Sequence, residues 1–572
     1  RYERGRLQTW DFRSWPPELP LNHGFHAVFD ETTYVNFWYT MRLAGLTPEA
    51  LKGRTLISNE HEILVHEAEA KRVCRLQVHP PDKYPFPFNS HLTEAALEVF
   101  LHGGWSPLEI YSFGTKVVQH LLTYTDFDDL ARLDLYQRIS FEKWCRDRGV
   151  RASVFNKMMF KFLFQGTYIA PNTMDGTSGL MGLWVILRHF NAAQWYYING
   201  GITEKLMLPI AEFLEAHGVR LRMRQMVAAL YTDDQLSTIQ RCETRPVEVR
   251  AALVEDLGPF DFFINTLPLD STVQLLKQSG RANPAPPGAE PANLLDGFPD
   301  IKTLERDDRF VDTVGTVNLQ AWFQEPGLLT DDGSPRGDYR NVIAGLEPLC
   351  VIVDYKNILP MYRNDPRIPG SVLEINGSLQ ELESPENYGY FESKTRFGNP
   401  HESRTIEFAK TIMIDIADRY KFPKLRAAVE REAFLDWPEM WEGRQLWPDR
   451  GTRIPPFLWK NTDPYNRFFV TGPGTLQYRP WIWRGLYPDD YLALRGPGYV
   501  GPKGYPDNLF LAGDWTRNGF DIPSMEGAAR SGRMAALSLI KAALGTADPT
   551  ADPTRPEPTR GDPDFIQIYD PI

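Results

Sequence analysis

The chain has 572 residues, of which 42% are hydrophobic, so it is long enough for two or three lobes with buried cores. Its formal net charge of −12 argues against a nucleic-acid partner, because phosphate binding needs clustered Lys and Arg. The four cysteines, Cys74, Cys145, Cys242 and Cys350, lie far apart with no metal or redox spacing, which suits a reducing compartment. We therefore expect no metal site.

No stretch approaches the roughly 18 apolar residues that a spanning helix needs. We therefore expect a cytoplasmic protein whose only membrane contact, if it has one, is peripheral. The first sixty residues carry turns and one helical pattern, Tyr34 to Leu46. From about Ser90 to Phe190, apolar residues recur every three or four positions, which predicts a mainly helical region.

The middle of the chain changes to alternating helix and strand signals. A helix is predicted from Thr203 to His217, ended by Gly218 and followed by strands. "FDFFINTLP", Phe260 to Pro268, is a short apolar run closed by proline, which predicts a buried strand. Residues 546–572 are rich in Pro, Asp and Thr and cannot pack a core alone, so this tail is disordered or an arm on a neighbour.

The segment "NLFLAGDWTRNGFDIPSMEGAARSGRMAALSLI", residues 508 to 540, carries the strongest pattern. Leu509 to Ala512 predict a strand buried on both faces. Gly513 then lets the backbone turn tightly and approach a ligand. Asp514 places a carboxylate at the carboxyl end of the strand, where open α/β sheets bind cofactors. Such a carboxylate suits hydrogen bonds from sugar-alcohol hydroxyls.

A helix rich in small residues follows this turn. Ser524 is the predicted N-cap, and Met525, Glu526 and Gly527 form the first turn. The free N–H groups there would stabilise an anion by about 0.3–1 kcal/mol. An ordinary packing helix behind a tight turn is the alternative interpretation.

Strand, Gly-Asp, loop and "SMEGA" helix together resemble the C-terminal flavin-binding segment of the flavin amine oxidase superfamily. The "GDWT…SMEGA" wording resembles its carotenoid desaturase branch, the phytoene and zeta-carotene desaturases. The resemblance implies FAD as the cofactor, with Asp514 at the ribityl–pyrophosphate region. It places the amides near Met525 at the isoalloxazine N1–C2=O edge, which becomes negative when the flavin is reduced.

Three weaker stretches agree in order. "YYINGGITEKLMLPIAEFLEAHGVRLRMRQMVAALYTDD" is similar to a Gly-Gly, helix, strand segment of the family, in which the position of Val227 contacts the adenosine. "FDFFINTLPLDSTVQLL" resembles the strand beneath the cofactor, and "LNHGFHAVF" resembles a His-Gly-x-His-x-x-Phe segment near the flavin. The predicted cofactor-binding residues are Gly24, Val227, Gly513, Asp514, Trp515, Ser524, Met525 and Gly527.

His23 and His26 are the catalytic candidates, because they form the only close histidine pair near the presumed flavin. Two polar residues that brace a loop are the alternative. Trp515 is expected either to stack near the flavin ring or to pack on the solvent side.

The family normally opens with a Gly-rich βαβ unit that holds the FAD pyrophosphate. The one G-x-G-x-x-G here is "GPGYVG", residues 496–501, and Pro502 and Pro506 follow it, so no helix can start as the fingerprint requires. We therefore expect the N-terminal Gly-rich βαβ unit to be missing from this chain. A removed or omitted piece is favoured; a second chain that supplies the unit and a loss of FAD binding are the alternatives.

These observations predict an α/β fold with a discontinuous Rossmann-like FAD lobe and a mixed α+β substrate lobe with a helical section. The FAD lobe is assigned residues 1–60, 196–275 and 455–545. The substrate lobe is assigned residues 61–195, mainly helical, and 276–454. The tail, 546–572, is expected to contact a homo-oligomer or a second subunit if it docks.

The predicted function is FAD-dependent oxidation, specifically desaturation of a lipophilic polyene or isoprenoid by hydride transfer to flavin N5. Double-bond isomerisation and amine oxidation are the alternatives among flavoenzymes. A non-catalytic subunit that kept the fold and lost FAD is the alternative from another class.

Overall fold

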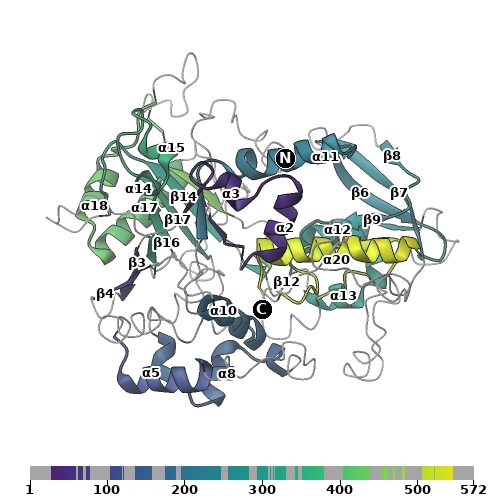
Figure 1. The fold of residues 1–572 in the computed structure, drawn as a ribbon, viewed down its shortest axis with the longest axis horizontal. Helices are drawn as coiled ribbons and strands as arrows, with labels where there is room; N and C mark the ends of the chain where they lie inside the picture. Colours follow the sequence, from purple (N-terminus) through teal and green to yellow (C-terminus); the bar gives the residue numbers. More distant parts are fainter. Residues whose placement is uncertain are drawn as a thin grey trace.

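The computed structural model describes residues 27–31, 33–58, 62–67, 72–77, 104–118, 120, 135–156, 174–188, 195–223, 225–246, 255–281, 293–306, 309–310, 313–314, 316–329, 342–344, 351–378, 403–437, 453–454, 456–460, 468–469, 479–483, 505–520 and 522–544. Within these residues the fold is mixed α/β, as expected. Figure 1 shows two lobes beside one another, with a helical section below them.

The first lobe is built on a seven-stranded sheet of order β18-β14-β17-β16-β15-β3-β4. All its neighbouring strands are antiparallel except β15 and β3, which are parallel. In that order the strands are Phe457–Lys460, Thr316–Trp322, Val372–Ser378, Val351–Asp354, Val342–Ala344, Glu62–Glu67 and Arg72–Gln77. β18 lies in the segment assigned to the FAD lobe, but it pairs with β14 here. Likewise β3 and β4 are strands at the start of the segment predicted to be mainly helical.

Helices α17 (Ser403–Tyr420) and α18 (Pro423–Glu430) cover one face of this sheet. Side chains alternate between faces along a strand, so every second residue of β14 and β17 points toward these helices. Leu319, Leu373 and Ile375 are fully buried there, in one apolar cluster with Met413 and Leu425. The other face of the sheet is turned toward the second lobe (Figure 1).

The second lobe contains smaller sheets. β9 and β20 are parallel, β6, β7, β8 and β10 form a four-stranded sheet, and β5 lies between β1 and β2. These strands are Phe263–Asn265 (β9), Leu509–Leu511 (β20), Gln225–Thr232 (β6), Ile239–Pro246 (β7), Glu255–Leu257 (β8), Gly280–Arg281 (β10), Trp195–Ile198 (β5), Ala27–Phe29 (β1) and Leu56–Ser58 (β2). The predicted strand at Leu509 is confirmed, and its three residues are buried.

The helices of this lobe pack beside these sheets. They are α2 (Val35–Leu43), α3 (Pro48–Leu51), η4 (Thr203–Met207), α11 (Leu208–Ala216), α12 (Leu269–Gln278), η5 (Leu294–Gly297), α13 (Pro299–Leu304) and α20 (Met525–Leu544). Val273 and Leu276 of α12 are fully buried in one cluster with Leu511. The helix predicted from Thr203 is confirmed as η4 and α11, and Gly218 after it has φ +86°.

The prediction that Phe260 to Pro268 form a buried strand is wrong in its burial. Phe260 and Ile264 are each 47% exposed. Within the described residues β9 pairs with β20 alone, so its other edge has no neighbouring strand. An apolar run indicates a tendency to be covered, and here the cover does not come from the described chain.

The helical section contains α5 (Pro107–Phe113), η2 (Gly114–Val118), α8 (Phe141–Asp147), η3 (Ala152–Asn156) and α10 (Gly176–Arg188). Gly179 of α10 lies directly on Phe141 of α8, where a Cβ atom would come within 2.3 Å of the ring. Short elements elsewhere are β11 (Glu305–Arg306), β12 (Arg309–Phe310), β13 (Thr313–Val314), β19 (Phe468–Phe469), α14 (Tyr355–Ile358) and α15 (Pro360–Arg363). Among the described helices, none has the length and apolarity to cross a membrane.

Candidate functional site

The candidate site begins where β20 ends in a tight turn at Gly513. This glycine has φ +150°, which L side chains rarely adopt. A Cβ atom at Gly513 would also lie 2.4 Å from Nε1 of Trp515. The turn predicted from "AGDWT" is therefore present, and only glycine fits it.

Trp515 does not pack on the solvent side, which was one of the two places expected from the sequence. Its side chain is 3% exposed and belongs to the apolar cluster of β20 and α12. The indole Nε1 donates to the carbonyl of Leu267 at 3.0 Å. Trp515 thereby joins the end of β20 to the loop after β9, which is a structural role.

Two hydroxyl groups that the sequence analysis did not select hold the turn against α20. The Gly513 amide donates to Oγ of Ser531 at 3.0 Å. The Thr516 hydroxyl lies 2.7 Å from the same Oγ and donates to the Gly513 carbonyl at 2.8 Å. Ser531 belongs to the small-residue side of the helix, and its size allows this close contact.

Asp514 is partly buried, and three backbone amides, its own and those of Trp515 and Ser524, stabilise the charged form of its carboxylate. Burial raises the pKa of the Asp514 carboxyl, while the guanidinium of Arg479 and these amides oppose that rise. Arg479 is 1% exposed and donates to the Phe520 carbonyl at 3.5 Å. No local sequence signal pairs Arg479 with Asp514.

Helix α20 begins as predicted. The Gly527 amide donates to Oγ of Ser524 at 3.0 Å, so Ser524 is the N-cap. A Cβ atom at Gly527 would lie 3.3 Å from the Ile522 carbonyl oxygen and 3.6 Å from Cβ of Asp514, so the first helical turn and the Asp514 turn are in contact. Met525 is partly buried against the apolar cluster around α2.

Glu526 joins the start of α20 to the start of α2. Its side chain is fully buried, and its carboxylate accepts from the Asn36 amide at 3.0 Å, the Asn36 side chain at 2.7 Å and the Phe37 amide at 2.9 Å. Burial raises the pKa of the Glu526 carboxyl, and these hydrogen bonds oppose the rise. Arg533 donates to Oδ1 of Asn36 at 2.9 Å and lies over the Tyr39 ring. Sequence reasoning missed this network.

Of the other predicted site residues, the structure describes Val227 alone. Val227 lies in β6 and is 40% exposed. His23, Gly24 and His26 lie outside the described residues, as do residues 496–501 and 546–572. In the described ranges no group of three or more His, Cys, Asp or Glu side chains could hold a metal ion.

No family model matches the chain, and no curated protein does. Several solved structures align with most of the chain at low identity. A triple mutant from a cofactor-binding redesign of putrescine oxidase is 11% identical over 89% of this chain and 86% of its own, with a TM-score of 0.48. Cyclohexylamine oxidase from Brevibacterium oxydans is 12% identical over 92% and 88%, with a TM-score of 0.46. Reduced UDP-galactopyranose mutase is 12% identical over 91% and 84%, with a TM-score of 0.45.

Proposed function

We propose that this chain is an FAD-dependent oxidoreductase of the flavin amine oxidase type. One observation carries the proposal: the end of β20, the Asp514 carboxylate and the first turn of α20 meet in one corner, in the order that the "GDWT…SMEGA" resemblance implies. When bound, FAD would supply the redox chemistry by accepting hydride at N5.

The residues in this corner have the chemistry to hold such a group. A carboxylate has about four acceptor positions. The nearby amides of Asp514, Trp515 and Ser524 stabilise the charge of the Asp514 carboxylate, which can also accept from a ribityl or ribose hydroxyl. The buried cation of Arg479 beside it favours the ionised form, which accepts such a hydroxyl most strongly.

The start of α20 would serve the flavin edge. The Gly527 amide donates to Oγ of Ser524, and the Ser524 amide stabilises the charge of the Asp514 carboxylate. The next amides, those of Met525 and Glu526, lie at the positive end of a 20-residue helix, where negative charge is stabilised. These amides are the ones we assign to the N1–C2=O edge.

For the substrate, we retain desaturation of a lipophilic polyene or isoprenoid as the finer proposal, with peripheral membrane contact during substrate uptake. It is supported by the resemblance of the "GDWT…SMEGA" motif to the desaturases. Isomerisation and amine oxidation remain the alternatives among flavoenzymes, and a cofactor-free subunit of the same fold is the alternative outside them.

Absorbance and flavin titration of protein purified from its own cells test the FAD proposal, because any further segment or subunit is then retained. We expect bands at about 375 and 450 nm, typical of oxidised flavin. Asp514→Asn should weaken FAD binding by about tenfold or more, since it removes a charge-assisted hydrogen bond. Asp261→Asn, at an exposed position before β9, is the matched control. Colourless protein that takes up no added FAD would contradict the proposal.

A further inference from the structure

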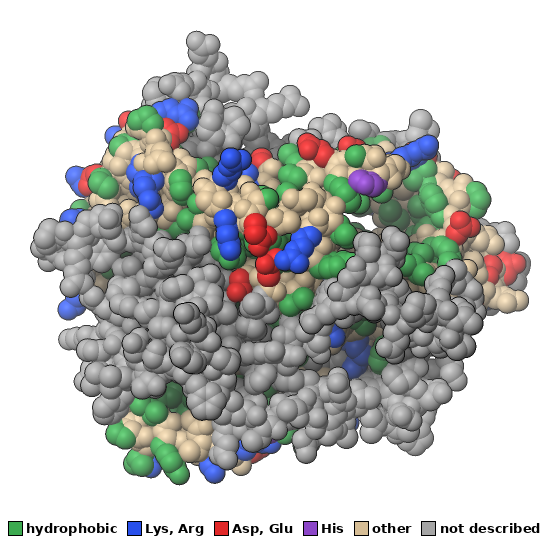
Figure 2. Space-filling model, viewed as in Figure 1, with side chains coloured by type: hydrophobic (Ala, Val, Ile, Leu, Met, Phe, Trp, Pro, Cys, Tyr) green, Lys and Arg blue, Asp and Glu red, His purple; other side chains and the backbone are tan. Residues whose placement is uncertain are grey.

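The most exposed apolar side chains of the described structure belong to the helical section. Four large apolar side chains are more than half exposed, and three lie in this section: Leu108 at 56%, Tyr111 at 68% and Leu135 at 58%. The fourth, Leu43 at 56%, ends α2 in the second lobe. Where Figure 1 shows α5, Figure 2 shows hydrophobic and basic side chains at the surface. Single exposed apolar residues are ordinary, but neighbours on one helix indicate a contact surface.

Helix α5 turns Leu108 and Tyr111 outward because its other side is buried. Glu109 and Phe113, four positions apart, are 5% and 9% exposed. The Phe113 ring packs edge-on to Trp105, with the ring centres 5.6 Å apart. Leu108 and Tyr111 are three positions apart, so they are neighbours on the helix surface. The helix is therefore held from the inside while it presents a leucine and a tyrosine to the outside.

The acidic side chain of this part of the chain is used internally. In residues 104–118 and 150–156, Glu109 is the only acid by sequence. Its Oε2 atom accepts from the Ser106 amide at 2.7 Å, and its Oε1 atom accepts from the Ser153 hydroxyl. The exposed charges of these residues are therefore all positive.

Two cations flank Tyr111. Arg151 directly precedes η3, and its amide lies 3.5 Å from Oγ of Ser112, the residue after Tyr111. Lys116 lies in η2, about one turn further along the helix. Both side chains are exposed. Within the described chain neither of them forms an ion pair.

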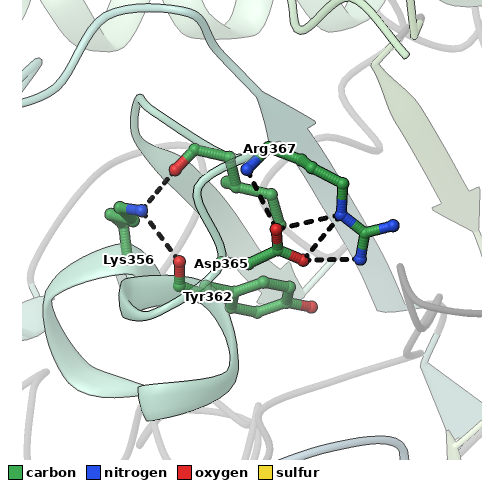
Figure 3. A network of polar contacts seen from close by, with 5 residues as sticks. Lys356, Tyr362, Asp365 and Arg367 are labelled. Atoms are coloured by element: carbon green, nitrogen blue, oxygen red, sulfur yellow. Dashed lines mark hydrogen bonds and ion pairs between the residues drawn. The ribbon is translucent and has the colours of Figure 1, made fainter. Parts of the chain in front are cut away.

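Two cations of the first lobe show the contrast. Figure 3 shows Nζ of Lys356 donating to backbone carbonyls, among them that of Tyr362 at 2.8 Å, and Arg367 contacting Asp365 at 2.7 to 3.2 Å. The donors of Lys356 are thus occupied, and a carboxylate cancels much of the Arg367 charge. Lys116 and Arg151 keep both charge and donors available to an anion outside the chain.

We propose that the α5 surface, defined as Leu108, Tyr111, Lys116 and Arg151, docks on an anionic lipid bilayer. Leu108 and Tyr111 would enter the boundary between head groups and acyl chains, where apolar and aromatic side chains partition. Lys116 and Arg151 would lie against the phosphates of the head groups. The chain has a net charge of −12, so a local positive surface is what directs this side toward the membrane.

A bilayer fits this surface better than a protein partner does. A stable protein interface buries about 1,200–2,000 Å² in total, far more than two apolar side chains supply. A bilayer accepts single side chains without a shaped partner and attracts the flanking cations over several ångströms. The combination of few apolar residues with exposed positive charge therefore favours lipid.

The proposed function includes peripheral membrane contact during substrate uptake, and this surface would provide it. The inference rests on that function only for its purpose, because docking on a bilayer needs no FAD. A lipophilic substrate would then pass from the membrane to the enzyme at the side of the helical section.

Co-sedimentation of the full chain with vesicles tests the proposal. We expect binding to phosphatidylcholine and phosphatidylglycerol mixed at about 2:1, and binding at least about fivefold weaker to phosphatidylcholine alone. This preference should fall as salt rises from about 0.1 to 1 M, since the Debye length shortens from about 10 to 3 Å. Equal binding to both vesicles, or binding to neither, would overturn the proposal.

Matched variants locate the surface. Leu108→Ser should weaken binding to the mixed vesicles about fivefold or more, because it removes an apolar side chain from the boundary. Lys116→Gln should lower the preference for anionic lipid about fivefold. Leu43→Ser is the control, since Leu43 is equally exposed in the second lobe, and it should bind like wild type. A loss in Leu43→Ser as large as that in Leu108→Ser would contradict the proposal.

Hydrogen exchange on the wild-type protein covers the case in which a variant does not fold. The amides of α5 and η2 should exchange more slowly with mixed vesicles present than without them, whereas those of α17 should be unaffected. Unchanged exchange in α5 and η2 would overturn the proposal.

The same sedimentation, with and without bound FAD, separates the two proposals. Vesicle binding by protein that never takes up FAD would uphold the α5 surface and remove the oxidoreductase function. Flavin-loaded protein that ignores both vesicles would do the reverse.

Discussion

The two lobes differ in how far the residues of their sheets are buried. In the seven-stranded sheet, one face packs on α17 and α18. The other face carries the carboxamide cluster, which consists of Asn318, Gln320, Glu374 and Asn376. Ile375 on the first face and Glu374 on the second are both fully buried. In the second lobe, Ile264 of β9 is 47% exposed and Val227 of β6 is 40% exposed. Helix α11 has an apolar sequence, LPIAEFLEA, yet none of its residues is buried.

This exposed apolar surface is more than scattered single residues. In the region where Figure 1 shows α11, β6 and β9, Figure 2 shows hydrophobic side chains around a hollow. Parallel strands are normally covered on both faces, and large exposed apolar patches usually mark a surface that binds something. Among the described residues, both faces of β14 and β17 in the first lobe are therefore buried, whereas this part of the second lobe gains little stability from the apolar residues it presents.

Matched isoleucine substitutions test this difference most directly. Ile375→Ala should lower the free energy of unfolding by about 4 kcal/mol, because it opens a cavity in a closed core. Ile264→Ala should lower it by less than about 1 kcal/mol, since half of that side chain already contacts solvent. Urea denaturation of both variants measures the two values. Equal losses would show that β9 is covered in the protein.

The buried acid in the first lobe should make its stability depend on pH. The folded protein holds the Glu374 proton up to about pH 8, whereas the unfolded chain releases it near the ordinary value of 4.5. Rising pH therefore favours the unfolded state, and about 3–4 kcal/mol of stability should be lost between pH 5 and pH 8. Glu374→Gln should flatten this dependence of stability on pH, because glutamine does not titrate. Gln320 can rotate its amide to keep the hydrogen bonds in this variant. The exposed Glu407→Gln should leave it unchanged.

In the second lobe the turn at Gly513 accepts only glycine, and alanine substitutions at Gly513 and Gly532 test this. Gly513→Ala should destabilise the protein by about 1–3 kcal/mol, since φ is positive and the new Cβ atom would strike Trp515. Gly532→Ala, in open space on α20, should stabilise by up to about 1 kcal/mol because alanine is the better helix former. Thermal unfolding measures both. The same sign for the two variants would contradict the geometry of the turn.

The smallest expected effect concerns the exposed apolar surface itself. Ile264→Lys should reduce the fluorescence of a hydrophobic dye while changing the melting temperature little, since the side chain lies on open surface. Ile540→Lys, at a 38% exposed position near the end of α20, is the control and should leave the dye signal nearly unchanged. If both variants lower the signal alike, the dye does not bind at β9.

The parts of this fold that could be predicted from the sequence are those with local signals. The strand at Leu509, the turn at Gly513 and the cap at Ser524 each depend on a few neighbouring residues. The hydrogen bonds between Glu526 and Asn36 and the charge interaction of Arg479 with Asp514 join distant positions, so no pattern in a single sequence indicates them. The burial of β9 was mispredicted for a related reason, because apolarity does not reveal which element will cover a strand.

The carboxamide cluster was missed because its polar residues alternate with apolar ones. Asn318 and Gln320 look like the solvent side of a half-buried strand, a pattern that usually means an exposed face. Only the arrangement of the lobes shows that this side is interior. Two carboxamides at alternate positions opposite a strand with Glu and Asn are a signal that could be sought in other sequences.

The contact between Glu526 and the start of α2 also has a consequence for how the chain is made. The two partners are 490 residues apart, so α2 leaves the ribosome long before the carboxylate that binds its first amides exists. Loop closure over such a distance is slow, and the second lobe can complete only after Glu526 has been synthesised. Until then the first amides of α2 lack the carboxylate that accepts from them, although most of the apolar residues packed against α2, among them Val28, Tyr196 and Leu206, have already been made.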